Sequence, residues 1–137
     1  MSIAITVCRL LKHLYHIDIK DSAIVDSAGS NIWQGRMEKL TDNIYVDGAH
    51  NPQGIQSFVN SVNGMYADST DKAALLFSVV SDKNFEQMIS ILCGCKVFAR
   101  IAITVTGGIR HLDKEYISAA FKRHTDIEVE AVSYTHL

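Results

Sequence analysis

The sequence has 137 residues, of which 47% are hydrophobic and 20% charged, and its formal net charge is -2. This balance is typical of one compact globular domain and excludes a disordered chain or a polyanion-binding protein. We therefore expect no nucleic-acid partner. We also expect no membrane partner, because the apolar runs are far shorter than the roughly 20 residues that a spanning helix needs. Three cysteines without a disulfide framework or a zinc pattern favour a reducing, cytoplasmic location.

The first 43 residues predict two helices and a connection. Ile3, Val7, Leu10, Leu11 and Leu14 recur at helical spacing, which indicates an amphipathic helix packed on a neighbour rather than a secretory signal. Residues 18–29 predict a short capped helix that ends near a glycine. Residues 30–43 are typical of a linker or an edge hairpin, and they contain the clearest candidate for a domain boundary.

From residue 44 onward, strands and helices alternate. Their apolar patterns predict strands at 44–47, 72–80, 99–108 and 127–132, and helices at 52–66, 82–95 and 112–125. This alternation predicts an α/β fold with a mostly parallel, Rossmann-like sheet and flanking helices. In such sheets ligands bind beyond the carboxyl ends of the strands. Three loops are therefore candidates for the site: DGAHNP, SDKN and TGGIRH.

The loop DGAHNP carries three polar side chains directly after a strand. The Asp47 carboxylate could accept hydroxyl hydrogen bonds from a ribose, or it could cap the loop, and the residue types leave both roles open. Asn51 followed by Pro52 favours a helix N-cap, whose positive end attracts an anion. His50 could donate to a phosphate or stack on a base, although a loop histidine is more often solvated.

The other two loops carry weaker signals. Asp82 or Asn84 reads as a helix cap, and Lys83 as a surface lysine. Arg110 and His111 could line the same site. The sequence contains no Gly-x-x-x-x-Gly-Lys-Ser/Thr phosphate loop, no Gly-x-Ser-x-Gly nucleophile motif and no His-Glu-x-x-His zinc motif.

The segment WQGRMEKLTDNIYVDGAHNPQG, residues 33–54, resembles the start of the carboxyl-terminal domain of folylpolyglutamate synthases. Some of these enzymes are also dihydrofolate synthases, and the family belongs to the Mur ligase superfamily. The resemblance extends over nearly the whole chain. Asn84 stands where the family usually has an acid, and Gly108 where it often has proline. The final VSYTHL is unlike the family and resembles translated adapter sequence.

The resemblance implies a fold, a domain division and a site. Residues 1–30 would be the helical tail of a central ATPase domain, and residues 31–137 an incomplete Mur ligase carboxyl-terminal domain. Arg36 and Asp47 stand where the family contributes to the ATP site, and His50 lies in the same loop. The segment between Arg36 and Asp47 is slightly shorter than in the family. No catalytic or metal-binding residue is implied within the chain.

The implied reaction is ATP-dependent ligation of L-glutamate to a folate by a monomeric enzyme, with ATP and Mg²⁺ as cofactors. The phosphate loop, the Mg²⁺ ligands and the folate pocket are expected in a missing amino-terminal domain, so the chain alone would be inactive. Two alternatives remain open from the residues: another Mur-superfamily amino-acid ligase, and a stand-alone nucleotide-binding α/β module. A purely structural domain would leave Asp47 and His50 without a role.

Overall fold

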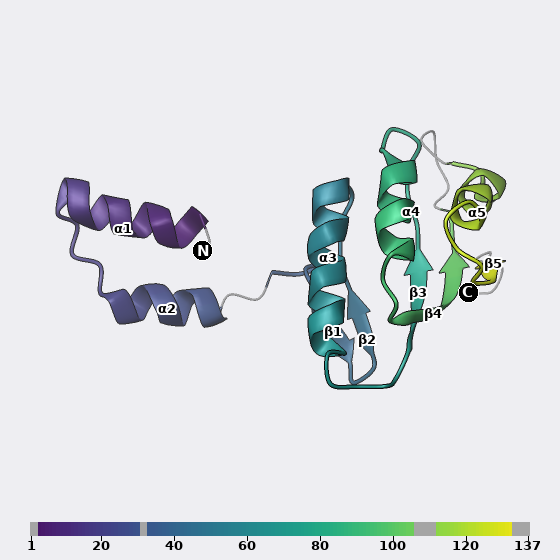
Figure 1. The fold of residues 1–137 in the computed structure, drawn as a ribbon. Helices are drawn as coiled ribbons and strands as arrows, with labels where there is room; N and C mark the ends of the chain where they lie inside the picture. The colour runs from purple at the N-terminus through teal and green to yellow at the C-terminus, as the bar shows by residue number, and fades with distance from the viewer. Residues whose placement is uncertain (1–2, 31–32, 106–111, 133–137) are drawn as a thin grey trace.

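The computed structural model describes residues 3–30, 33–105 and 112–132, apart from the side chains of residues 28 and 30. Its first two elements are α1 (Ile3–Tyr15) and α2 (Asp21–Ser30), which lie side by side at the amino-terminal end (Figure 1). Lys12 of α1 pairs with Asp21 of α2 at 3.0 Å. Both helices are therefore confirmed. The first one packs against α2, as predicted, but no residue of α1 is fully buried there.

The connection after α2 contains a hairpin, one of the two structures that its sequence allowed. Strand β1 (Glu38–Thr41) pairs antiparallel with β2 (Ile44–Val46), and the register shifts between Lys39 and Thr41. Asp42 and Asn43 form the turn between the two strands.

A three-stranded parallel sheet follows, in the order β3-β4-β5. Strand β3 (Ala73–Phe77) pairs with β4 (Phe98–Ile103), which pairs in turn with β5 (Val129–Ala131). The predicted α/β class is confirmed, with a parallel sheet and flanking helices. One part of the expectation is wrong: β2 forms no ladder with this parallel sheet among the described residues, and its only partner there is β1.

Helices α3 (Pro52–Met65), α4 (Phe85–Cys93) and α5 (Lys114–Lys122) connect and cover the strands. Helix α3 packs against α4, and α4 against α5 (Figure 1). The core between helices and sheet includes the fully buried side chains Met88, Ile89, Leu92, Ile103, Ile117 and Phe121. Phe77 of β3 and Phe121 of α5 meet edge to face, with ring centroids 5.7 Å apart. No described helix is long and apolar enough to cross a bilayer.

Two predicted helix starts have the expected caps. Asn51 precedes α3 in an extended conformation, and its side-chain oxygen accepts from the Gly54 N–H at 2.8 Å. Asn84 caps α4 by accepting from the Gln87 N–H, at the longer distance of 3.4 Å. Each cap satisfies one of the backbone donors that the first turn of a helix leaves without an internal partner.

Two adjacent leucines of β3 provide a matched test of where the core lies. Leu75 is 7% exposed and Leu76 is 60% exposed. We expect Leu75→Ala to lower the free energy of unfolding by about 2–4 kcal/mol, because truncating a buried leucine leaves a cavity. We expect Leu76→Ala to change it by less than about 0.5 kcal/mol. Urea denaturation of both variants measures the difference, and equal losses would contradict this sheet orientation.

Candidate functional site

The site begins at a tight turn in front of the hairpin. The Arg36 N–H donates to the Trp33 carbonyl at 3.1 Å, and Gly35 has a positive φ of 68°. A turn with positive φ at its third residue favours glycine there. The Gly48 N–H donates to the Gly35 carbonyl at 2.7 Å, and a Cβ on Gly48 would come within 3.3 Å of that oxygen. The turn and the loop after β2 therefore lie in direct contact.

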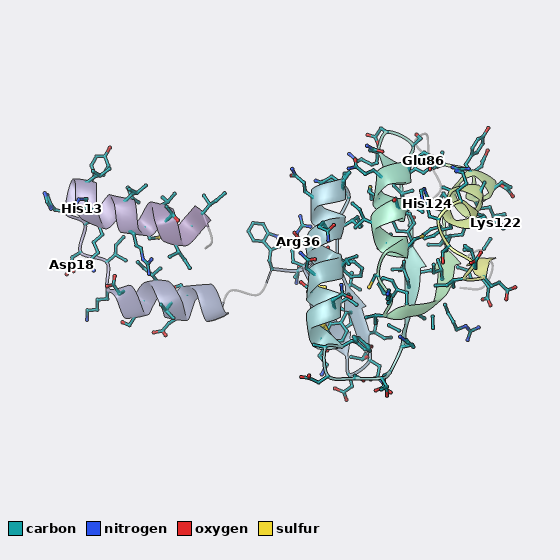
Figure 2. All side chains as sticks on the ribbon, in the orientation of Figure 1. His13, Asp18, Arg36, Glu86, Lys122 and His124 are labelled. Atoms are coloured by element: carbon teal, nitrogen blue, oxygen red, sulfur yellow. The ribbon has the colours of Figure 1, made fainter. Side chains whose placement is uncertain are left out.

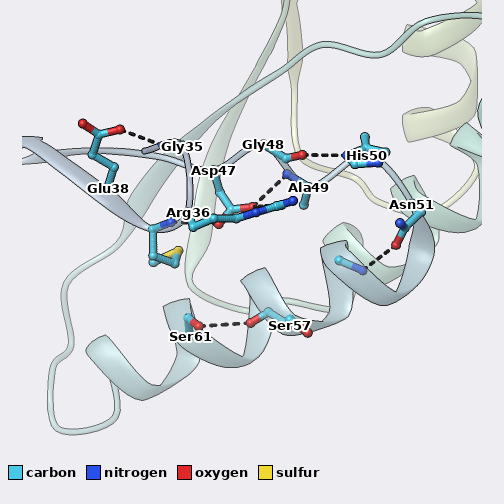
Figure 3. A network of polar contacts seen from close by, with 12 residues as sticks. Gly35, Arg36, Glu38, Asp47, Gly48, Ala49, His50, Asn51, Ser57 and Ser61 are labelled. Carbon is cyan, nitrogen blue, oxygen red and sulfur yellow. Dashed lines mark hydrogen bonds and ion pairs between the residues drawn. The ribbon is translucent and has the colours of Figure 1, made fainter. Parts of the chain in front are cut away.

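Asp47 holds these two segments together through its carboxylate (Figure 3). Its Oδ2 accepts from the Met37 N–H at 2.8 Å, and its Oδ1 accepts from the Ala49 N–H at 2.8 Å. Met37 has a φ of 45°, an unfavourable conformation for a side chain other than glycine. The hydrogen bond to Asp47 helps to hold it there. The structural role that the sequence left open for Asp47 is thus present.

Arg36 extends from the turn towards the start of α3 (Figures 2 and 3). Its Nη1 lies 4.0 Å from Asp47 Oδ1, and its side chain is 53% exposed. An ion pair this long and this exposed contributes little to stability. Most of the guanidinium donors therefore remain available for a ligand. A planar cation with several fixed donors is well suited to phosphate oxygens.

His50 adds a ring whose protonation pattern follows from its contact. Its Nδ1 lies 2.9 Å from the Gly48 carbonyl oxygen. A carbonyl only accepts, so Nδ1 must carry the proton. In neutral His50 the Nε2 atom is therefore an acceptor, suited to a hydroxyl or an amino group. Nε2 can donate to a phosphate only when both ring nitrogens carry a proton. The phosphate-binding role that the sequence suggested for His50 is therefore restricted to the protonated ring.

Helix α3 contributes polar side chains that the sequence analysis did not select. Gln53, Ser57 and Ser61 follow one another at four-residue spacing on the face opposite the buried Ile55 and Val59. The Ser57 hydroxyl donates to the Gln53 carbonyl and the Ser61 hydroxyl to the Ser57 carbonyl, each at 3.1 Å. This spacing is visible in the sequence as a polar helical stripe.

These residues enclose a pocket of about 410 Å³. Its lining includes all three side chains selected from the sequence (Arg36, Asp47 and His50), together with Asn51, Gln53, Gly54, Ser57, Phe58 and Ser61. The volume lies in the range of small-molecule sites. The cationic side chain of Arg36 and the start of α3 face the pocket, whereas the Asp47 carboxylate is largely buried. The pocket therefore suits an anionic ligand with hydroxyl groups.

The remaining candidates lie elsewhere. Lys83 is 3.8 Å from Asp82 in the loop after β3 and does not line the pocket. Arg110 and His111 fall outside the described residues. A second polar cluster joins Glu86 of α4 to Arg123 and His124 after α5 (Figure 2). Its members are partly exposed and face no described pocket, so ordinary surface ion pairing accounts for it.

Two of the three cysteines, Cys93 and Cys95, have the environments of inert thiols. Cys95 is buried, and its Sγ lies 3.4 Å from Asn63 Oδ1. Burial raises the pKa of the Cys93 thiol above its ordinary value. A raised pKa reduces the thiolate fraction and hence the nucleophilicity near neutral pH. Within the described residues, no group of three or more His, Cys, Asp or Glu side chains is arranged to hold a metal ion.

Comparison with known proteins shows two curated relatives. The dihydrofolate synthase/folylpolyglutamate synthase of Bacillus subtilis is 30% identical over 76 residues, which are 54% of this chain and 17% of that protein. The folylpolyglutamate synthase of Lacticaseibacillus casei is 24% identical over 90 residues, or 64% of this chain and 20% of that protein. This chain thus spans at most about a fifth of either relative. No protein-family model matches the sequence.

Solved structures give the same result. Folylpolyglutamate synthase from Thermotoga maritima is 26% identical, with a TM-score of 0.65 over 90% of this chain and 30% of that one. E. coli FolC in complex with ADP has a TM-score of 0.73 at 17% identity, over 93% of this chain and 29% of that one, which shows the shared fold.

Fold and pocket together define an α/β module with a polar site between a strand end and a helix start. The chain is homologous to part of the folylpolyglutamate and dihydrofolate synthases.

The first prediction from this geometry concerns Asp47. We expect Asp47→Asn to lower the free energy of unfolding by about 1.5–3 kcal/mol. One carboxylate oxygen becomes an NH₂ group, which cannot accept a hydrogen bond, so one of the two charge-assisted bonds to a backbone N–H is lost. Asp42→Asn is the control, since the Asp42 side chain is 97% exposed and should change stability by less than about 0.5 kcal/mol. Thermal or urea unfolding measures both. An unchanged free energy of unfolding in Asp47→Asn would contradict the role of Asp47 in holding the two segments together.

The second prediction concerns Cys93. Because burial raises its thiol pKa, the thiolate fraction at pH 8 is smaller than that of an unperturbed cysteine. We expect iodoacetamide to modify Cys93 more slowly than a cysteine in a short peptide at pH 8. The rate should keep rising as the pH passes the ordinary thiol pKa. Peptide mapping by mass spectrometry measures the rate, and fast modification at pH 7 would contradict the prediction.

Proposed function

We propose that this chain is the carboxyl-terminal part of an ATP-dependent ligase that adds L-glutamate to folates. Residues 1–30 would be the tail of its central ATPase domain, and residues 31–137 its carboxyl-terminal domain. The observation that carries the proposal is the 30% identity to the Bacillus subtilis dihydrofolate synthase/folylpolyglutamate synthase. The gathering of Arg36, Asp47 and His50 around one pocket supports it independently.

The ligands of similar structures support a nucleotide as a ligand of the proposed ligase. The structures with the same fold include E. coli FolC with DHPP and ADP, and a Yersinia pestis bifunctional synthase with AMPPNP and a Mn ion. By analogy, this chain would share in binding ATP, with Mg²⁺ held by ligands in another part of the ligase. The bound metal would supply charge neutralisation at the phosphates.

In the proposed reaction a folate carboxylate attacks the γ-phosphorus of ATP and ADP leaves. The amino group of glutamate then attacks the acyl carbon, the amide bond forms, and phosphate leaves with its bonding electron pair. Arg36 would bind phosphate oxygens through its free guanidinium donors and stabilise the developing negative charge. Such a cation acts most strongly where water is excluded.

Asp47 and His50 would act at the nucleoside end of the same ligand. The Asp47 oxygens each accept one backbone N–H, which leaves a lone pair on each for a ribose hydroxyl. Neutral His50 offers Nε2 as an acceptor to a hydroxyl or to an adenine amino group. Asp47 also fixes the backbone of Met37, the residue after Arg36, so it would orient the guanidinium as well as bind.

A chimera tests the proposed function. Residues 33–132 would replace the matching segment of the Bacillus subtilis relative, and the product would be assayed for ATP-dependent addition of glutamate to tetrahydrofolate. We expect activity, and we expect Arg36→Ala to raise the KM for ATP about ten- to a hundredfold with little change in the KM for folate.

Arg100→Ala is the matched control in the chimera, because Arg100 is an exposed arginine on β4 that pairs with Glu130 and does not line the pocket. It should leave both KM values unchanged. Equal effects of the two arginine variants, or a folded chimera without ligase activity, would contradict the proposal. A preference for muramoyl precursors over folates would instead favour another Mur-superfamily ligase.

The isolated 137-residue chain should behave as part of such a site. We expect no ligase turnover and at most millimolar ATP affinity, since one cationic side chain and one helix start provide few phosphate contacts. Titration with ATP, followed by the amide signals of Gly48 and Gly54, measures the affinity. Robust ligase turnover by the chain alone would contradict the proposal that the chain is only one part of the active site.

A further inference from the structure

The backbone around Arg36 is held at three successive N–H groups. The three acceptors are Glu38 Oε2 for the Gly35 N–H at 2.7 Å, the Trp33 carbonyl for the Arg36 N–H at 3.1 Å, and Asp47 Oδ2 for the Met37 N–H at 2.8 Å. The Trp33 carbonyl closes the turn, and Asp47 connects the turn to the loop after β2. Glu38 is the remaining acceptor, and it is absent from the lining of the pocket.

Glu38 acts on the backbone and not on the pocket. It lies on the opposite side of the Gly35 turn from the Arg36 guanidinium (Figure 3). The neighbouring cation Lys39 does not neutralise it, because Lys39 pairs with Asp42 at 3.1 Å. The Glu38 carboxylate is therefore committed to the Gly35 N–H, and it is not placed to contact a ligand in the pocket.

The hydrogen bond from Gly35 to Glu38 constrains the most flexible part of this segment. Glycine adopts positive and negative φ about equally well, so a contact is needed to hold the φ of 68° at Gly35. The bond closes a ring that contains the backbone dihedral angles of Gly35, Arg36 and Met37. Met37 also has a positive φ, of 45°, which is unfavourable for its side chain. Without the Glu38 acceptor, both residues could relax towards negative φ and turn the backbone of Arg36 with them.

The position of the Arg36 guanidinium is sensitive to such a rotation. The charged group stands at the end of a long side chain, so a small turn of the backbone displaces it by a larger distance. Its contact with Asp47, at 4.0 Å and with the arginine half exposed, is too weak to correct the displacement. A misplacement of about 1 Å in a group that positions a substrate can cost about a hundredfold in rate. The direction of the guanidinium therefore depends on the fixed backbone.

We propose that Glu38 is a positioning residue for Arg36. By accepting the Gly35 N–H, Glu38 fixes the turn from which the guanidinium reaches the phosphate oxygens of a nucleotide. Asp47 holds the Met37 N–H, so the backbone of Arg36 is fixed on both sides. The inference rests on the proposed function, because it needs a nucleotide in the pocket, and it adds a residue that acts without touching that ligand.

Three substitutions of Glu38 in the Bacillus subtilis chimera separate the acceptor from the charge. Glu38→Ala removes the acceptor and should raise the KM for ATP about tenfold, with less than about a twofold change in the KM for folate. Glu38→Asp keeps the charge, but its shorter side chain cannot reach the Gly35 N–H, so the same rise is expected. Glu38→Gln keeps an acceptor oxygen at the same reach and should stay within about threefold of the parent. A KM for ATP that follows the charge instead, high in Glu38→Gln and normal in Glu38→Asp, would overturn the inference.

A double variant shows whether Glu38 acts through Arg36. Arg36→Ala combined with Glu38→Ala should have the KM for ATP of Arg36→Ala alone, since no guanidinium remains to be positioned. Effects that multiply would show an independent structural role and would overturn the inference.

Glu128→Ala is the matched control, because Glu128 is an exposed glutamate just before β5 and does not line the pocket. It should leave the KM for ATP unchanged. An equal rise in Glu38→Ala and Glu128→Ala would contradict a specific role of Glu38.

Measurements on the free 137-residue chain separate this inference from the proposed function. The Gly35 amide should exchange at least about tenfold faster in Glu38→Ala than in the parent or in Glu38→Gln. The thermal midpoint of Glu38→Ala should fall by less than about 8 °C, so that the chain stays folded. Titration with ATP, followed by the Gly48 and Gly54 amides, should show at least about threefold weaker binding in Glu38→Ala.

The two possible failures have different outcomes. Unchanged ATP binding by the free Glu38→Ala chain would overturn the role of Glu38, whatever the chimera does. An inactive parent chimera, with weaker ATP binding by free Glu38→Ala, would overturn only the proposed ligase activity.

Discussion

The candidate site depends on one largely buried carboxylate that accepts hydrogen bonds from two backbone N–H groups in different segments. Asp47 connects the residue after the Gly35 turn with the residue that leads towards α3. The two segments are not adjacent in sequence, so a contact must hold them together. A charged acceptor binds their N–H groups more strongly than a neutral one would. Met37 keeps its positive φ in this arrangement, and Arg36, its neighbour, is thereby directed into the pocket.

The contacts around this carboxylate give the site residues different roles. Asp47 is largely committed to backbone donors, whereas Arg36 is half exposed and only loosely paired with it. His50 is oriented by a carbonyl that fixes its tautomer. The helix start behind them is already capped by Asn51, so its remaining N–H groups and its dipole can act on a ligand. Recognition of an anion would therefore rest mainly on Arg36 and α3, with Asp47 as the support.

Burial is unevenly distributed over the molecule. The layer between α3, α4, α5 and the parallel sheet is closely packed, with several side chains fully buried. In contrast, α1 and β2 carry apolar residues that the described chain leaves exposed. These exposed apolar residues fit the proposal that the chain is part of a longer ligase, in which the rest of the polypeptide would cover them. The homology to proteins of which this chain spans about a fifth agrees with that interpretation.

The sequence by itself determined most of the elements and their order, since helical and strand periods, Asn51 as a cap and the DGAHNP loop are local signals. It left the second cap open between Asp82 and Asn84, and it left residues 30–43 open between a linker and a hairpin. It also selected Arg36, Asp47 and His50, through loop position and family resemblance. Only the tertiary structure decided that β2 pairs with β1 outside the parallel sheet, that Asp47 clamps Met37, and that Ser57 and Ser61 face the pocket. The physical reason is that strand pairing and side-chain contacts join residues distant in the chain, and no local period encodes which edge a strand will find.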